Sequence, residues 1–178
     1  GTLVNGPQWV DGKVGKALSF DDNKIIDLSK TRSAILGGSP PFSFEVWIKP
    51  NNSGGYIMTD HYACGNWESI LLSQNYFIVN PGNSAGTRQT LSFTAPPANQ
   101  WSHIAVVWTG SLSFVYLNGV LYAGPISASN APWNAPSTLT IGAVKQATFD
   151  CWGSGTGWIA EEFNGIIDEV RVYNRALS

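Results

Sequence analysis

The sequence predicts an all-β protein built as a sandwich of two antiparallel sheets. The 19 Gly and 10 Pro are spread along the whole chain, as expected where turns join many short strands. The 8 Trp, 8 Phe and 6 Tyr favour pleated, half-buried surfaces. Between the turns, apolar and polar side chains alternate with a period of two, and helical periodicity is almost absent. Two sheets packed face to face bury the apolar sides of such strands.

The segment 42–49, with the sequence FSFEVWIK, is the clearest predicted strand because its side chains alternate so regularly. Its two faces hold Phe42, Phe44, Val46 and Ile48 on one side, and Ser43, Glu45, Trp47 and Lys49 on the other. We expect the apolar face in the core and the polar face against solvent or a ligand. Two interpretations of Trp47 stay open: a binding platform on the concave face of the sheet, or a ring covered by a long loop.

Other segments between turn residues show related patterns. We predict strands at 17–20, 25–28, 55–59, 68–73, 76–79, 88–94, 101–109, 112–117, 120–122, 138–142 and 163–173. Asn118-Gly119 predicts a tight hairpin, because both residues tolerate positive φ in a two-residue turn. The last strand is expected to direct its side chains to two faces, Val170 and Val172 to one and Glu169, Arg171 and Tyr173 to the other. One short helix is expected within 29–36.

Composition and charge narrow the function classes. The net charge is −2 and the ten Lys and Arg are scattered, so no basic stripe predicts a nucleic-acid partner. No run of 18 apolar residues predicts insertion into a membrane. The length of 178 residues suits one domain, 1–178, with a single core. Because the chain starts at Gly1 without Met, we expect one module of a larger exported protein.

The two cysteines, Cys64 and Cys151, leave two interpretations open. An isolated pair does not make a metal site, because no second pair or histidine spacing completes it. The cysteines could be two buried free thiols. A disulfide is favoured, since each cysteine lies in a similar polar, aromatic-rich loop, and it would indicate an oxidising compartment.

Four segments together carry a family pattern: GKALSFD at 15–21, FSFEVWIKP at 42–50, WSHIAVVW at 101–108 followed by YLNG at 116–119, and FNGIIDEVRVYNRALS at 163–178. In order and spacing they resemble the laminin-G-like family of the concanavalin A-like superfamily. The resemblance implies a jelly roll of two curved antiparallel sheets. It also implies a secreted or cell-surface setting, often bacterial, with neighbouring domains such as glycoside-degrading enzymes or adhesins in the same chain.

The resemblance further implies one structural calcium ion. Asp21 and Asp168 match the positions where the acidic ligands of the family tend to occur. Ca²⁺ takes six to eight oxygen ligands, so two carboxylates need support from carbonyls, which the turn Asp21-Asp22-Asn23 could offer. The alternative is that Asp21 forms a turn and Asp168 is a solvated strand residue.

Polar and aromatic residues gather in two predicted loops that also hold the cysteines. Aromatic rings with nearby carboxylates, amides and imidazoles are typical of sugar sites, since a ring stacks on C–H faces while polar groups bond hydroxyls. The candidate ligand-binding residues are Asp60, His61, Tyr62, Asn66, Trp67, Trp133, Asp150, Trp152 and Trp158. A bond between the cysteines would join the loops that carry Trp67 and Trp152. The alternative is that these rings cap the core and bind nothing.

Catalysis is not predicted. Glycosidases of this class place two carboxylates on one strand face across the scissile bond, and neither Glu45 nor Asp168 has such a partner two positions away. The neighbours Glu161-Glu162 and Asp168-Glu169 would point to opposite faces if they lay in strands. His103 lies within a predicted strand, where a structural role is favoured.

The sequence therefore predicts a non-catalytic, lectin-like module that binds carbohydrate and targets a larger secreted or surface protein to a polysaccharide or glycan. The glycan itself is not specified by the sequence. The alternative is a structural or protein-adhesion module without sugar binding.

Overall fold

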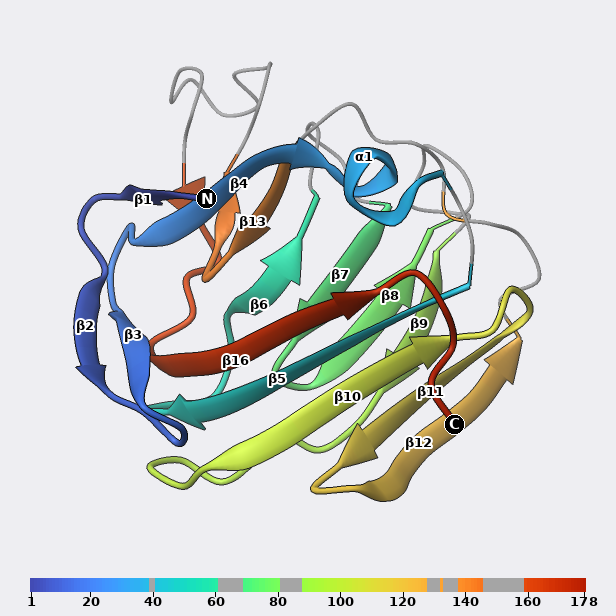
Figure 1. Cartoon of the computed structure of the whole chain (residues 1–178). Helices are drawn as coiled ribbons and strands as arrows, with labels where there is room; N and C mark the ends of the chain where they lie inside the picture. The colour runs from blue at the N-terminus through green and yellow to red at the C-terminus, as the bar shows by residue number, and fades with distance from the viewer. Residues whose placement is uncertain (39–40, 61–68, 81–87, 128–131, 133–137, 146–158) are drawn as a thin grey trace.

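The computed structural model describes residues 1–38, 41–60, 69–80, 88–127, 132, 138–145 and 159–178. In these residues the predicted all-β sandwich is confirmed, with two seven-stranded sheets packed face to face (Figure 1). Every described strand pair of the two sheets is antiparallel. Among the described residues, no helix has the length and apolar character to cross a membrane.

The sheet at the back of Figure 1, called the back sheet, begins at the N-terminal strand. Its strands are, in spatial order, β1 (Thr2–Val4), β4 (Ile25–Thr31), β13 (Thr138–Ile141), β6 (Tyr56–Thr59), β7 (Ile70–Ser73), β8 (Tyr76–Val79) and β9 (Gln89–Ser92). The helix α1 (Arg32–Leu36) follows β4, and a two-stranded ribbon joins β14 (Val144–Lys145) to β15 (Ile159–Ala160).

The sheet nearer the viewer, called the front sheet, holds the longest strands. Its spatial order is β12 (Val120–Ser127), β11 (Leu112–Leu117), β10 (Ser102–Trp108), β5 (Phe42–Pro50), β16 (Gly165–Tyr173), β3 (Lys16–Phe20) and β2 (Gln8–Asp11). The first and last parts of the sequence thus meet in this sheet, because β16 pairs with both β3 and β5. The predicted hairpin is confirmed: Asn118 and Gly119 have φ of 51° and 80°, and Leu117 pairs with Val120.

The core lies between the sheets and follows from the alternation in β5. Its buried residues include Phe44, Val46 and Ile48 of β5 and Ile104 and Val106 of β10. Removing this apolar surface from water is the main stabilising contribution to such a sandwich. Because alternate residues of a strand face opposite ways, the same packing directs the other half of β5 and β10 to the outer face of the front sheet.

A bulge in β16 changes the alternation near its middle. Asp168 pairs with Trp47 and Arg171 pairs with Glu45, so three steps along β16 span two steps along β5. Glu169, in the bulge, has a φ of 49°. The extra residue keeps both Ile167 and Val170 against the core, and it brings Arg171 to the outer face beside Glu45.

Candidate functional site

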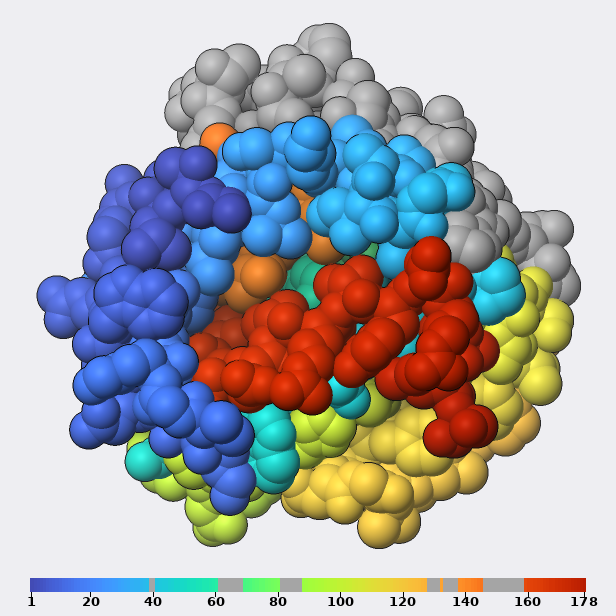
Figure 2. Space-filling model, viewed as in Figure 1, coloured from blue at the N-terminus to red at the C-terminus, as the bar shows by residue number. Residues whose placement is uncertain are grey.

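The outer face of the front sheet gathers polar and aromatic side chains from three central strands. In register, Trp47 of β5 lies opposite His103 of β10, and Glu45 lies between Ala105 of β10 and Arg171 of β16. In Figure 2 this face lies between the N-terminal hairpin, in blue, and the C-terminal segment, in red. The strands that build the core therefore also fix the spacing of these outward side chains.

Three side chains converge on the carboxylate of Glu45. The Tyr173 hydroxyl donates to Glu45 Oε1 at 2.5 Å, and Arg171 Nη1 lies 3.4 Å from the same oxygen. Arg171 also donates through Nη2 to Glu169 of the bulge, so one guanidinium joins two carboxylates. His103 Nε2 lies 3.7 Å from Glu45 Oε2. Glu45 is consequently held in place, with only 17% of its side chain exposed.

Trp47 continues this row of side chains. Its ring centroid lies 5.2 Å from that of His103 with an interplanar angle of 48°. The ammonium group of Lys13 lies 4.8 Å from the Trp47 ring centroid, a cation–π contact. The Trp47 ring is half-buried on the outer face, and the turn between β2 and β3, which carries Lys13, lies over it.

Asp168 holds that turn in position. Its Oδ2 accepts a hydrogen bond of 2.9 Å from the backbone N–H of Val14, and its Oδ1 accepts one from the N–H of Glu169. At Gly12 a Cβ would lie 2.5 Å from Asp168 Oδ2, so a side chain there would push the turn away. Asp168 thus positions Lys13 through the backbone of its neighbours.

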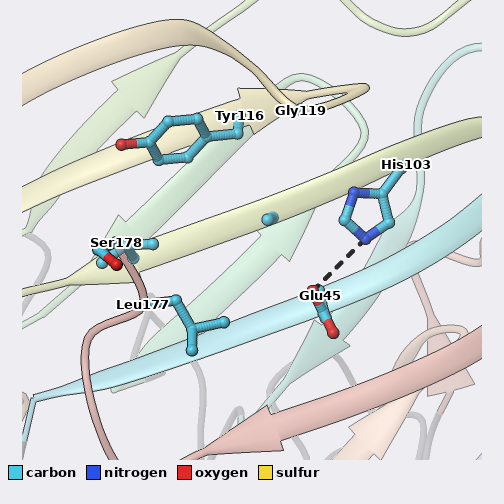
Figure 3. Close-up of a pocket in the computed structure, with 8 residues that line it drawn as sticks. Glu45, His103, Tyr116, Gly119, Leu177 and Ser178 are labelled. Carbon is cyan, nitrogen blue, oxygen red and sulfur yellow. Dashed lines mark ion pairs between the residues drawn. The ribbon is translucent and has the colours of Figure 1, made fainter.

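A pocket of about 290 Å³ opens beside Glu45 and His103. Its lining residues are Glu45, His103, Ala105, Val107, Tyr116, Gly119, Leu177 and Ser178. Figure 3 shows Glu45 and His103 at one end of the hollow and Leu177 and Ser178 at the other. The C-terminal segment is held there because Ser43 Oγ donates to the carbonyl of Arg175 and accepts from the N–H of Leu177.

Burial lowers the pKa of His103 below its ordinary value; Glu45 opposes this shift and Arg171 adds to it. The unfolded chain therefore takes up this proton first as the pH falls through about 6.5, and the folded state loses stability from there downward. We expect the free energy of unfolding to fall between about pH 7 and pH 5, and this dependence to be weaker in His103→Gln.

Urea unfolding of both proteins across that pH range measures the effect. An unchanged slope in His103→Gln would show that His103 is not the responsible group, and would direct attention to the second histidine or the carboxylates. The hydroxyl of Tyr173 is not a competing group in this window, because its bond to Glu45 raises its pKa.

Asp60, a predicted ligand-binding residue, lies in the interior with 0% exposure. Its Oδ1 accepts from the N–H groups of Ser69 and Ile70, its Oδ2 accepts from the Ser69 hydroxyl, and Arg32 Nε lies 3.8 Å away. Burial raises the pKa of the Asp60 carboxyl, and these bonds and the charge of Arg32 oppose the rise. Asp60 is therefore a buried structural carboxylate and does not bind a ligand at the surface. A ligand-binding role was expected because Asp60 is a polar residue in a predicted loop.

Asp21 and Asp168, the predicted calcium ligands, are not brought together. Phe20 pairs with Gly165, so Asp21 lies about four residues along the β3–β16 pair from Asp168, roughly 13 Å. Asp21 forms an exposed ion pair of 2.7 Å with Lys24, and Asp168 holds the turn above Trp47. In the described part of the chain, no three His, Cys, Asp or Glu side chains are grouped as a metal site requires. One ion bound by both carboxylates does not fit this arrangement.

The remaining predicted residues lie outside the described ranges. They are His61, Tyr62, Asn66, Trp67, Trp133, Asp150, Trp152 and Trp158, together with the cysteines Cys64 and Cys151. Their roles, and the disulfide, stay predictions.

Glu45, His103 and Arg171 were not among the predicted ligands, and a binding role for Trp47 was one of two open interpretations. Alternation in β5 and β10 directs Glu45, Trp47 and His103 away from the core. Their convergence depends on strand order and on the bulge, which brings Arg171 opposite Glu45. Neither feature can be read from one strand alone.

The fold and this face define a class: a jelly-roll β-sandwich with a polar, aromatic pocket on one sheet. The chain belongs to the concanavalin A-like lectin/glucanases superfamily, because the sequence profile of its Laminin_G_3 family matches residues 24–178. The predicted family is therefore confirmed. No curated protein matches the chain in a sequence search.

Solved structures share the fold at low identity. Domain 4 of AbnA, a GH43 extracellular arabinanase from Geobacillus stearothermophilus, in complex with arabinotriose, is 22% identical with a TM-score of 0.58, over 100% of this chain and 78% of that chain. The CBM40 of the Ruminococcus gnavus IT-sialidase, bound to alpha2,3 sialyllactose, is 15% identical with a TM-score of 0.66, over 91% of each chain. A SAP-like pentraxin from Limulus polyphemus is 20% identical with a TM-score of 0.56, over 90% of this chain and 75% of that chain.

Proposed function

We propose that this chain is a non-catalytic carbohydrate-binding module that holds a glycan on the outer face of the front sheet. The observation that carries the proposal is the pocket lined by Glu45, His103 and Tyr116, with the ring of Trp47 packed against His103. An aromatic ring such as that of Tyr116 packs on the apolar face of a sugar, while a fixed carboxylate and an imidazole bond its hydroxyls. Because these groups are already held by neighbours, little ordering is needed on binding.

The arrangement around Arg171 supports a binding role rather than hydrolysis. A glycosidase needs two carboxylates separated by the scissile bond, with room for the sugar between them. Here the guanidinium of Arg171 contacts both Glu45 and Glu169 and occupies that space. The same fold does occur in enzymes, since the Trypanosoma rangeli sialidase shares it with a TM-score of 0.55 over 26% of that chain.

The family and its neighbours in structure support a wider targeting role. A domain of an extracellular arabinanase and the CBM40 of a sialidase share this fold with bound sugars. By analogy, this module would keep a secreted or surface protein, whose other domains lie in the same chain, on its glycan. A structural calcium ion stays a prediction.

A protein-adhesion role is the second candidate, favoured by one observation. The edge strand β12 exposes apolar side chains, with Val120 68%, Leu121 49% and Tyr122 44% exposed. Exposed apolar side chains on an edge strand are also found at protein contacts. It lies on the strand next to β11, which contributes Tyr116 to the pocket, so the two roles can be separated by substitution.

Affinity gel electrophoresis on a panel of soluble polysaccharides, followed by titration calorimetry, tests the proposal. We expect Tyr116→Ala to weaken glycan binding about ten-fold, because it removes one wall of the pocket. Tyr122→Ala, the same change on the adjacent strand, should leave the affinity unchanged. Retention by no polysaccharide, or equal losses in both variants, would contradict glycan binding at this pocket.

A further inference from the structure

The charges of the outer-face pocket bear on which sugars it accepts. Neighbours with this fold hold both arabinotriose and sialyllactose, so the fold alone does not decide between neutral and acidic sugars. Among the described residues that line the pocket there is no Lys or Arg, and Glu45 is the only charged side chain of that set when His103 is neutral. An acidic sugar needs a cation to bond its carboxylate, usually a forked contact to Arg.

The guanidinium group that faces Glu45 is already engaged. Arg171 Nη1 faces Glu45 at 3.4 Å, and Nη2 donates to Glu169. One cation thus serves two carboxylates, which leaves an excess of negative charge beside the pocket. A ligand carboxylate would have to break one of these contacts and lie close to a half-buried glutamate.

The ammonium of Lys13 does not reverse this balance. It lies over the ring of Trp47 at 4.8 Å, outside the residues that line the pocket. The turn that carries it is fixed to the carboxylate of Asp168 through Val14. Placing an anion in the pocket would therefore set it against Glu45, without a free cation from any described lining residue.

We infer that the outer-face pocket selects neutral, hydroxyl-rich sugars and excludes carboxylated or sulfated ones through Glu45, an inference that rests on the proposed function. Glu45 Oε2 faces His103 at 3.7 Å, too far for a direct hydrogen bond, and can accept one from a sugar hydroxyl. The hydroxyl of Tyr116 can donate to or accept from another. Like charges at short range in a partly desolvated pocket disfavour an acidic ligand.

Affinity gels with neutral polysaccharides (arabinan, arabinoxylan, galactomannan) and acidic ones (polygalacturonate, alginate, heparin) test this inference. We expect retention by a neutral polymer only, with an affinity that changes less than about two-fold between low salt and about 0.5 M NaCl. Tighter binding to an acidic polymer, weakened by salt, would overturn the selectivity while leaving glycan binding intact. Retention by neither group would instead reject the proposed function.

Glu45→Gln provides the matched variant, because it removes the charge and keeps the shape. We expect it to raise the affinity for acidic polymers relative to neutral ones at least ten-fold. Glu161→Gln, an exposed residue outside the pocket lining, makes the same change in net charge and should have no such effect. Thermal melts confirm that both variants fold. An equal gain in both variants would assign the effect to overall charge and overturn the role of Glu45.

Discussion

Replacing Arg32 with Met is expected to lower the free energy of unfolding by about 3–5 kcal/mol. Arg32 is 1% exposed, and it faces the fully buried carboxylate of Asp60 at 3.8 Å. Its guanidinium also donates to the Ser69 hydroxyl and to the carbonyl of Pro132. Without this cation, the fold must either hold a buried carboxylate without its positive partner or protonate it. Urea denaturation at neutral pH measures the loss.

A double variant distinguishes the lost charge from simple loss of packing. Asp60→Asn keeps an oxygen for the N–H groups of Ser69 and Ile70 and removes the charge. Arg32→Met combined with Asp60→Asn should therefore recover at least about 2 kcal/mol of the loss. A single variant within about 1 kcal/mol of the wild type, or a double variant no better than the single, would contradict this account.

Replacing Trp47 with Ala is expected to weaken glycan binding about 30-fold or more, because its ring supports His103 at the edge of the pocket. The ring packs against His103, which lines the pocket, and its contacts with His103 and Lys13 hold its position. Trp47→Phe should retain part of the affinity, since a smaller ring still stacks. Titration calorimetry with the polysaccharide that retains the wild type measures both changes.

Variants of two other tryptophans provide a control and a test of the alternative site. Trp9 is 66% exposed on β2, so Trp9→Ala controls for unspecific contacts of an exposed ring. Trp152 represents the cysteine-bearing loops, in which the sequence predicts a glycan site. If Trp152→Ala abolishes retention and Trp47→Ala does not, the glycan lies at those loops and the outer-face site is wrong.

The sequence predicts the strands whose residues alternate, because burial on one face leaves a visible pattern. Segment 42–49 becomes β5, and the Asn118-Gly119 turn forms as expected. The strands β1 and β2 were not predicted, since they are short, mostly exposed and placed at sheet edges. Their order in the sheets follows from long-range pairing rather than from local residue preference.

The site was harder to predict than the fold for a physical reason. A charged residue is expected at the surface, yet Arg32 and Asp60 neutralise one another inside the protein. Aromatic residues in loops suggest a ligand site by residue type alone. Glu45 and His103 suggest one only when the pairing of β5 with β10 is known, because that pairing brings them together. The opposite faces expected for Asp168 and Glu169 assumed unbroken alternation, which the bulge interrupts.

Because of the bulge, the pocket depends on the number of residues in β16 as well as on their identity. If the same residues of β16 paired with β5 without the bulge, every side chain after Asp168 would change sides. Val172 would then face solvent, and Arg171 and Tyr173 would point toward the apolar interior, although the rest of the chain stayed the same. A graft of this pocket onto another sandwich must therefore transfer the insertion together with the residues that follow it.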